Sequence, residues 1–300
     1  MDVRKVGVVG CGLMGSGIAQ VAAQAGFETV VREVDEAVLR RGLGAIESFL
    51  ARGVERGKVK EADRQATLGR LRGTTKLDDL AACDIVVEAI VEDRAAKRSL
   101  FGELEGLLGA EAILASNTSS LSITEMAAAT RRPERFVGLH FFNPVPLMPL
   151  VEVVRTMLTD PEVEAVVGRF GVALGKTVVR ATDRTGFVVN RLLVPYLLDA
   201  VRALEEGVGS IEDIDAGMRL GCGYPMGPFT LLDLVGLDTT VSIAGIFFEE
   251  FREPRYATPP LIRRMVLAGF HGRKSGRGFY DYSGPQPRPN DFLWQRLGRA

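Results

Sequence analysis

Three glycines with a fixed spacing lie near the start of the chain, directly after a short apolar run. The run Lys5–Val9 is strand-like, and a small-residue segment typical of a helix begins at Ser16. Between a strand and a helix, such glycines allow a sharp turn, close approach of backbone N–H groups to a pyrophosphate, and tight packing of helix on strand. The pattern predicts dinucleotide binding by the residues of this turn, which are Gly10, Cys11, Gly12, Leu13, Met14 and Gly15.

An acidic residue ends the next strand-like run. This residue is Glu33, 18 positions after Gly15, where the dinucleotide fingerprint requires a carboxylate. Because a carboxylate accepts hydrogen bonds from both ribose hydroxyls and repels a 2′-phosphate, Glu33 favours NAD over NADP as the cofactor. The guanidinium of the adjacent Arg32 leaves open some binding of a 2′-phosphate.

Hydride transfer from an alcohol to a nicotinamide needs a base for the hydroxyl proton, and histidine titrates closest to neutral pH. The chain has two histidines, and His271 lies in a glycine- and cation-rich segment typical of a surface loop. His140 instead lies near the end of an apolar strand, at the edge where open α/β sheets bind ligands. Glu152 follows 12 residues later among aliphatic residues, so we expect it to pair with the His140 ring and to stabilise the imidazolium. The pattern leaves open a core histidine beside an unrelated glutamate.

Two further polar sites lie within apolar surroundings. Asn190 lies in a buried-looking helix start, where an amide needs partners, and it makes either a structural hydrogen bond or a substrate contact. Residues 116–120 are five small polar residues between a strand and a helix. One of them is enough to cap the helix, which leaves the others to face a ligand.

The elements that position these residues follow from the hydrophobic pattern. The first half of the chain alternates short apolar runs with amphipathic stretches, which is typical of βαβ units around a parallel sheet. Residues 36–73 form a long charged segment and predict two helices broken near Gly57, an insertion that could overhang a ligand. After Thr185 the pattern is helical throughout. We therefore predict an α/β fold, with a Rossmann-type NAD-binding domain carrying a helical insertion over residues 1–184 and an all-helical substrate and dimerisation domain over residues 185–300.

Composition excludes several other classes of protein. With 46% hydrophobic and 25% charged residues the chain is neither disordered nor fibrous, and a net charge of -1 provides no basic excess for nucleic acid or an anionic membrane. Three cysteines far apart in the sequence suggest neither a disulfide framework nor a metal site. The first residues suggest neither a signal peptide nor a membrane span, so we expect a cytoplasmic protein. The surplus of apolar residues in the helical half, such as Leu192 and Leu197, favours a homodimer.

Five motifs occur in the order and spacing of the L-3-hydroxyacyl-CoA dehydrogenases, and the chain resembles this family over nearly its whole length. The length is similar to that of the 3-hydroxybutyryl-CoA dehydrogenase branch. The motifs lie at residues 10–19, 115–121, 138–146, 186–191 and 223–228, and they read GCGLMGSGIA, ASNTSSL, GLHFFNPVP, GFVVNR and GYPMGP.

The resemblance implies a role for each site residue. His140 is the catalytic base, Glu152 is its partner, and Ser119 and Asn190 form hydrogen bonds to the reacting oxygen. The resemblance adds further contacts to NAD, from Glu92, Lys97, Asn143 and Lys274. For the CoA part of an acyl-CoA substrate it implies Ser48, whereas Glu55 occupies the place of a CoA-binding lysine of the family, with cationic residues nearby.

The implied reaction is the reversible NAD-dependent oxidation of an L-3-hydroxyacyl-CoA, with 3-hydroxybutyryl-CoA as the expected substrate. One alternative is a hydroxy-acid dehydrogenase without CoA, similar to the L-gulonate 3-dehydrogenases, which the loss of the lysine at Glu55 favours. A second alternative is a catalytically silent dinucleotide-binding protein on the same scaffold. Four residues argue against this second alternative, because a protein that only binds a dinucleotide does not need them. They are His140, Glu152, Ser119 and Asn190.

Overall fold

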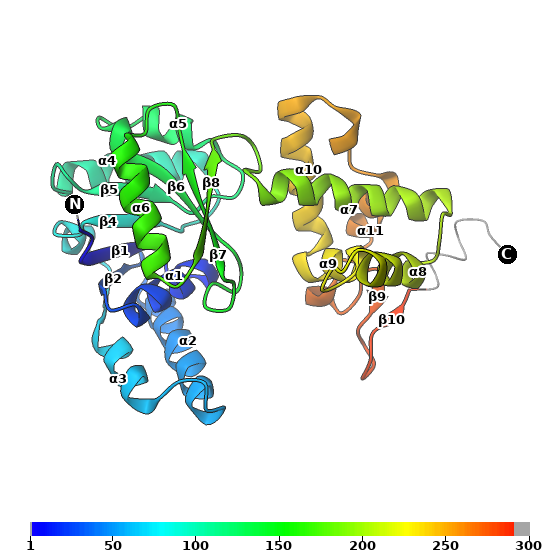
Figure 1. The fold of residues 1–300 in the computed structure, drawn as a ribbon, viewed down its shortest axis with the longest axis horizontal. Coiled ribbons are helices and arrows are strands. Elements are labelled where there is room, and N and C mark those ends of the chain that lie inside the picture. Colours follow the sequence, from blue (N-terminus) through cyan, green and yellow to red (C-terminus); the bar gives the residue numbers. More distant parts are fainter. Residues whose placement is uncertain (1, 291–300) are drawn as a thin grey trace. The chain divides into compact units, whose positions relative to one another are not determined.

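The computed structural model describes residues 2–290 and divides the chain into two compact units, residues 1–187 and 188–300 (Figure 1). The first unit is a Rossmann-type α/β domain and the second is largely helical, which confirms the predicted fold class.

The first unit is built on one sheet with eight strands in the order β3-β2-β1-β4-β5-β6-β7-β8 (Figure 1). Neighbouring strands are parallel except β6 and β7, which are antiparallel. The strand order reverses between β1 and β4, and open sheets of this kind bind ligands in the crevice at the carboxyl ends of the strands there. The strands are β1 Lys5–Val9, β2 Glu28–Arg32, β3 Leu71–Thr74, β4 Ile85–Glu88, β5 Ile113–Ser116, β6 Phe136–Phe141, β7 Leu150–Arg155 and β8 Thr177–Thr182.

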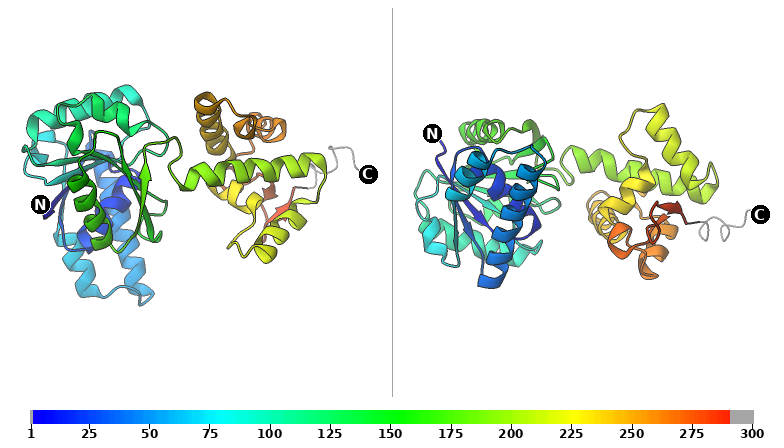
Figure 2. Two further views of the ribbon diagram at one scale, coloured as in Figure 1. Left: turned by 45° about the horizontal axis from the view of Figure 1, so that its top comes forward. Right: turned by 90° about the horizontal axis from the view of Figure 1, so that it is seen from below.

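Helices cover both faces of this sheet (Figure 2). Alternate residues of a strand point to opposite faces, so the neighbours Val86 and Val87 belong to different hydrophobic cores. One core packs Ile18 and Phe170 against the sheet, and the other packs Phe101. The helices and helical turns of this unit are α1 Leu13–Gln24, α2 Glu36–Glu55, α3 Glu61–Gly69, η1 Leu77–Leu80, α4 Arg94–Leu107, α5 Ile123–Ala128, η2 Pro133–Arg135 and α6 Pro161–Ala173.

The predicted helical insertion is present as α2 and α3. Asp35 caps α2 by accepting a hydrogen bond from the N–H of Val38, and Gly57, at φ 65°, lies in the break between the two helices. The prediction that this helical segment extends to residue 73 is wrong, because residues 71–74 pair with β2 as the edge strand β3. That parallel pairing gives the backbone of these residues the hydrogen-bond partners that a helix would otherwise supply.

Over its described residues, 188–290, the second unit packs five helices around its own core, which includes Phe229, Leu232 and Phe279. It differs from the all-helical prediction by a short antiparallel pair of strands, β9 and β10, whose bounds are given below. A break at Gly236, at φ 101°, separates two successive helices, Pro228–Val235 and Leu237–Phe251. The elements are α7 Val189–Glu206, α8 Ile211–Ala216, η3 Gly217–Gly221, α9 Pro228–Val235, α10 Leu237–Phe251, η4 Pro254–Tyr256, α11 Pro260–Leu267, η5 Arg273–Ser275, β9 Tyr280–Asp281 and β10 Arg288–Pro289.

Across residues 2–290, no single helix combines the length and apolarity needed to cross a membrane; only α9 and α10 taken together, with a bend of 93° between them, meet those limits.

A buried carboxylate organises the glycine-rich loop of the second unit. Asp233, 1% exposed, accepts hydrogen bonds from the N–H groups of Phe279 and Tyr280 and from the hydroxyl of Tyr282. A Cβ atom on Gly278 would lie 1.9 Å from Oδ1 of Asp233, and one on Gly272 would lie 2.4 Å from its backbone oxygen. These glycines therefore allow the loop to close around Asp233.

Asp233 should make the protein less stable as the pH rises. Burial outweighs the three hydrogen bonds and raises its pKa from 3.8 to about 6, so between these values the folded state binds more protons than the unfolded state. The stabilisation present at low pH is therefore lost as the pH rises through this window, by about 3 kcal/mol. The amide introduced by Asp233→Asn cannot titrate, so the variant lacks this pH dependence. Urea titrations measure the free energy of unfolding of both proteins, and the value of wild type minus that of the variant should fall by about 3 kcal/mol between about pH 4 and pH 7. A constant difference would contradict the assignment.

Candidate active site

The histidine and glutamate predicted to pair lie directly opposite each other on β6 and β7. The antiparallel register aligns His140 with Glu152, and Nδ1 of His140 lies 2.7 Å from Oε2 of Glu152. The pair is buried, with His140 6% and Glu152 0% exposed. The predicted pairing is confirmed, and the alternative of an unrelated glutamate is wrong.

This geometry determines which nitrogen of His140 is left to act as a base. A carboxylate only accepts hydrogen bonds, so Nδ1 carries the proton and donates it to Glu152. Nε2 then has a free lone pair, and within residues 2–290 it has no hydrogen-bond partner. The rings of Phe142 and Phe187 lie 4.6 and 5.5 Å from the imidazole ring, centroid to centroid. Such apolar neighbours exclude water and strengthen the attraction between an imidazolium and Glu152.

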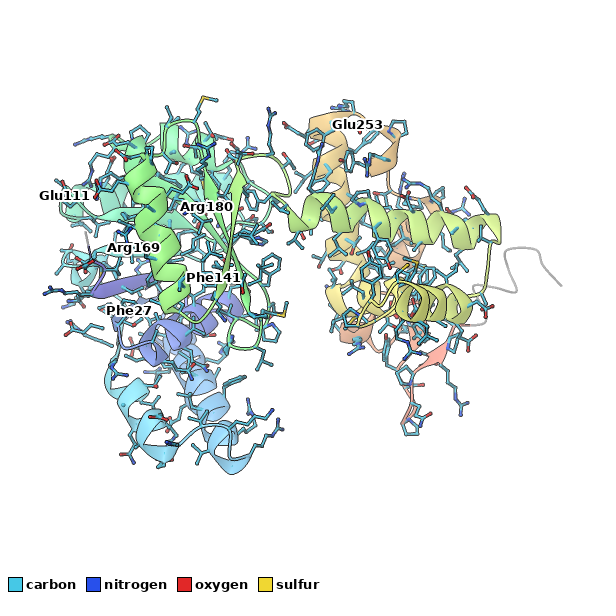
Figure 3. The ribbon with its side chains drawn as sticks, in the orientation of Figure 1. Phe27, Glu111, Phe141, Arg169, Arg180 and Glu253 are labelled. Atoms are coloured by element: carbon cyan, nitrogen blue, oxygen red, sulfur yellow. The ribbon has the colours of Figure 1, made fainter. Side chains whose placement is uncertain are left out.

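The polar loop after β5 is tied to the end of β6. The side-chain oxygen of Asn117 accepts a hydrogen bond from the N–H of Phe141, the residue after His140, at 2.9 Å (Phe141 is labelled in Figure 3). Ser119 is half-buried in the same loop, and its N–H donates to Glu92 at 3.3 Å. The structure therefore brings the loop with Ser119 to the end of the strand with His140.

The residue that caps the helix after this loop lies outside the predicted run. Ser122 caps α5 by accepting a hydrogen bond from the N–H of Glu125. The hydroxyls of Thr118 and Ser120 instead donate to Glu92. The expectation that one residue of 116–120 serves as the cap is therefore wrong, because the helix begins two residues further on.

Two of the predicted cofactor residues belong to a buried charge cluster. The ammonium of Lys97 lies 2.5 Å from Oε1 of Glu88 and 3.1 Å from Oε2 of Glu92. Lys97 is 1% exposed, so it is an interior residue, and its contact with a cofactor stays a prediction. Glu88 was not predicted, although it carries the signal that identified Glu33, an acidic residue at the carboxyl end of an apolar strand.

The glycine turn has the shape that a pyrophosphate needs. Gly10 has φ 97°, and a Cβ atom there would lie 2.5 Å from the oxygen of Ala89. A Cβ atom on Gly15 would lie 1.9 Å from the oxygen of Gly10, so only glycine at this position allows the start of α1 to pack against the turn. By contrast, a Cβ atom on Gly12 would meet no atom within 4 Å, and Gly12 has no side chain to cap the N–H groups at the start of α1. These N–H groups are available to an anion.

The other two residues of the turn differ in their surroundings. Leu13, the first residue of α1, is 73% exposed, whereas Met14 packs against the first core. Between the glycines, burial and the charge of Glu33 raise the pKa of the Cys11 thiol to about 11, so the thiol is neutral near pH 7. The turn therefore contacts a charged side chain, the carboxylate of Glu33, which can accept hydrogen bonds from ribose hydroxyls.

Glu33 is held in place by the same turn. Oε2 accepts a hydrogen bond from the N–H of Cys11 at 2.8 Å, and Oε1 accepts one from Val34 at 2.7 Å. A carboxylate has about four lone-pair sites, so each oxygen keeps capacity for a ribose hydroxyl. The open space at Gly12, the uncapped start of α1 and this anchored carboxylate together fit a dinucleotide with free ribose hydroxyls.

Replacement of Gly12 should separate cofactor binding from folding. An alanine methyl group fits the free protein, so the melting temperature of Gly12→Ala should match that of wild type. The methyl group would block the approach of a pyrophosphate to the N–H groups, and loss of a hydrogen bond to a charged group should raise the dissociation constant of NADH about 10- to 100-fold. Titration of NADH fluorescence measures this constant. Gly102→Ala, with open space around the Cβ position in α4, is the matched control and should bind NADH normally.

Four predicted site residues remain, two in each unit. Asn143 is exposed and follows the end of β6 by two residues, and Ser48 is exposed on α2. Asn190 and Lys274 belong to the second unit. Asn190 is the second residue of α7 and half-buried, and Nζ of Lys274 donates to Asp238 at 2.7 Å. The roles of these four residues stay predictions.

Comparison with known proteins agrees with this geometry. Residues 5–184 match the NAD-binding domain of 3-hydroxyacyl-CoA dehydrogenase, and residues 186–282 match the C-terminal domain of the same family. A 3-hydroxybutyryl-CoA dehydrogenase of Mycobacterium tuberculosis is 54% identical over 282 residues, which are 93% of this chain and 99% of that protein. One from Bradyrhizobium diazoefficiens is 48% identical over 287 residues, 96% of this chain and 98% of that protein.

Solved structures show the same similarity. The crystal structure of FadB2 of Mycobacterium tuberculosis matches with a TM-score of 0.91 and 53% identity, over 94% of this chain and 100% of that one. The structure of the (S)-3-hydroxybutyryl-CoA dehydrogenase PaaH1 from Ralstonia eutropha also has a TM-score of 0.91, with 44% identity and the same coverage, 94% and 100%. With its glycine turn, Glu33 and the pair of His140 and Glu152, this chain belongs to the 3-hydroxyacyl-CoA dehydrogenase family, and NAD is its cofactor.

Proposed function

We propose that the protein catalyses the reversible oxidation of L-3-hydroxyacyl-CoA to 3-oxoacyl-CoA, with 3-hydroxybutyryl-CoA as its substrate. The observation that carries this proposal is the 2.7 Å contact between His140 and Glu152, in the sheet that also bears the dinucleotide turn. Bound NAD would supply the acceptor for the hydride that leaves C3 of the substrate. The relatives named 3-hydroxybutyryl-CoA dehydrogenase support the choice of acyl group.

The side chains of the candidate site have different roles in the proton transfer. Nε2 of His140 takes the proton from the C3 hydroxyl, and Glu152 stabilises the positive charge that then develops on the ring. Ser119 and Asn190 donate or accept hydrogen bonds at the reacting oxygen and hold it in place. In the reverse direction the imidazolium of His140 returns the proton to the oxygen of the 3-oxo group.

Other residues of the chain bind the two ligands. Glu33 accepts hydrogen bonds from the ribose hydroxyls and disfavours a 2′-phosphate, so NADP should bind weakly. Glu92, Lys97, Asn143 and Lys274 complete the cofactor site, and Ser48 contacts the CoA part of the substrate. We expect no nucleic-acid or membrane partner, because a net charge of -1 provides no basic excess for either.

The reaction is tested by following the absorbance of NADH in the presence of acetoacetyl-CoA, with NADPH and free acetoacetate as parallel controls. The proposal expects fast oxidation only with NADH and the CoA ester. Oxidation of a free sugar acid such as L-gulonate by NAD, without turnover of the ester, would instead support the hydroxy-acid alternative. Binding of NADH without any turnover would support the silent binding protein.

We further infer a cytoplasmic homodimer formed through the second unit. Several large apolar side chains of this unit are mostly exposed in the single chain, including Leu192 at 68%, Leu220 at 76% and Leu267 at 82%. Exposed apolar side chains of this kind favour association with a second copy. Light scattering coupled to gel filtration should give twice the mass of one chain, and Leu192→Glu should lower that mass.

A further inference from the structure

Glu88 is a carboxylate with no exposed surface at the carboxyl end of a central strand. Oε1 accepts hydrogen bonds from Nζ of Lys97 at 2.5 Å and from the N–H of Ile90 at 2.8 Å, and Oε2 accepts one from the hydroxyl of Ser116 at 2.6 Å. A buried carboxylate is costly unless it is paired and hydrogen-bonded, and Glu88 is both. Its closest charge is the ammonium of Lys97.

The cluster formed by Glu88, Lys97 and Glu92 contains two carboxylates and one ammonium. With both carboxylates ionised, its net charge is therefore -1. Burial by itself would raise the pKa of Glu92, but Lys97 and the hydroxyls of Thr118 and Ser120 hold that pKa below its usual value. Glu92 is 38% exposed, whereas Lys97 and Glu88 are buried, so the surplus negative charge lies at the side of the cluster that a ligand can reach.

The sheet order brings this cluster close to the reactive end of the cofactor. Glu33 follows β2 and His140 lies on β6, and the ends of β4 and β5 lie between these two strands. Glu92 belongs to the loop after β4, and it accepts hydrogen bonds from the loop after β5. A dinucleotide bound between Glu33 and His140 would therefore pass the cluster. The nicotinamide belongs at the His140 side, because the carbon that gives the hydride also bears the hydroxyl that His140 deprotonates.

We propose that Glu88 is a positioning residue that sets the balance between NAD⁺ and NADH, by neutralising Lys97 so that the charge of Glu92 favours the oxidised cofactor. NAD⁺ and NADH differ by one positive charge, which lies on the nicotinamide ring. A nearby net negative charge therefore stabilises NAD⁺ relative to NADH, and a neutral cluster does not. The inference rests on the proposed function, because His140 determines where the nicotinamide belongs.

The test measures the dissociation constants of NAD⁺ and NADH separately, by calorimetry and by NADH fluorescence. Glu88→Gln keeps the size of the side chain and the two hydrogen bonds that Oε1 accepts, and its NH₂ group takes the place of Oε2 beside the hydroxyl of Ser116. The substitution makes the cluster neutral. We expect the dissociation constant of NAD⁺ to rise about 5- to 20-fold, because one charge is lost at close range with partial screening by solvent. The constant of NADH should change by less than about 2-fold.

A matched control lies on the same side of the sheet. Glu105 has a side chain that is 7% exposed, and it accepts hydrogen bonds from the N–H groups of Arg131 and Arg132. It lies near the end of α4, about 16 Å along the helix axis from Arg94, the first residue of that helix. Glu105→Gln should therefore leave the ratio of the two dissociation constants unchanged.

Equal changes in both constants of Glu88→Gln would show a purely structural role and overturn the proposal. Glu92→Gln also removes one negative charge and should shift the ratio in the same direction, so it decides the question if Glu88→Gln does not fold. A shifted ratio in a protein that does not reduce acetoacetyl-CoA would support the charge effect and reject the proposed reaction. A wild-type protein that binds neither form of the cofactor would overturn both.

Discussion

The His140→Gln variant should lose about 10³- to 10⁴-fold in kcat for the reduction of acetoacetyl-CoA. Glutamine has a similar size and can form hydrogen bonds, but it cannot carry a proton to or from the reacting oxygen. The loss should appear in kcat, because the proton moves only in the transition state, whereas the KM for the ester should change little. Steady-state kinetics from the absorbance of NADH measures both quantities.

The second histidine of the chain provides the control for this experiment. His271 lies in the second unit, where its N–H donates to the hydroxyl of Ser275. Because this contact uses the backbone and not the imidazole ring, His271→Gln should keep kcat near the wild-type value. The NADH dissociation constant of His140→Gln should also match that of wild type. If His140→Gln kept more than about a tenth of the wild-type kcat, His140 would not be the acid and base of the reaction.

The Glu152→Gln variant should lose about 10³-fold in kcat. Glu152 is fully buried opposite His140, so its negative charge acts on the ring without screening by solvent. A neutral amide removes the stabilisation of the imidazolium. When the NH₂ group of the amide faces Nδ1, Nδ1 must accept a hydrogen bond, so the ring proton lies on Nε2 and Nε2 cannot act as a base. The measurement is again kcat with acetoacetyl-CoA and NADH.

The double variant shows whether the two residues act as a unit. If Glu152 works only through His140, then His140→Gln with Glu152→Gln should be no slower than His140→Gln alone. Glu152→Asp keeps the charge but shortens the side chain by one methylene group, so its kcat should lie between those of wild type and Glu152→Gln. Additive losses in the double variant would assign Glu152 a separate role in the reaction.

Much of the candidate site was predictable because its signals are local in the sequence. The glycine turn needs only a strand, three glycines at fixed spacing and a helix, and all of these lie within residues 5–24. Glu33 was predictable because it ends the next strand. The pair of His140 and Glu152 was predictable because a carboxylate among aliphatic residues needs a partner, and the two adjacent strands supply one.

Other features depend on pairings between distant segments, and these were missed. Residues 71–74 look like the end of a charged helical segment, yet they form β3 because β2 offers them a free edge. Glu88 and Lys97 both have the residue types of a solvated surface, and only the packing of α4 on the sheet buries them together. The hydrogen bond from Phe141 to Asn117 likewise joins residues 24 positions apart.

The sequence by itself therefore determined the fold class, NAD as the cofactor and the pairing of His140 with Glu152. Those features follow from residue types at short spacing, where the backbone geometry of a turn or a strand leaves few choices. Only the tertiary structure decided which charges are buried and which partner each has, because the free energy of a buried ion depends on neighbours that folding brings together from distant parts of the chain. The burial of Lys97 between Glu88 and Glu92, at 2.5 and 3.1 Å, is an example.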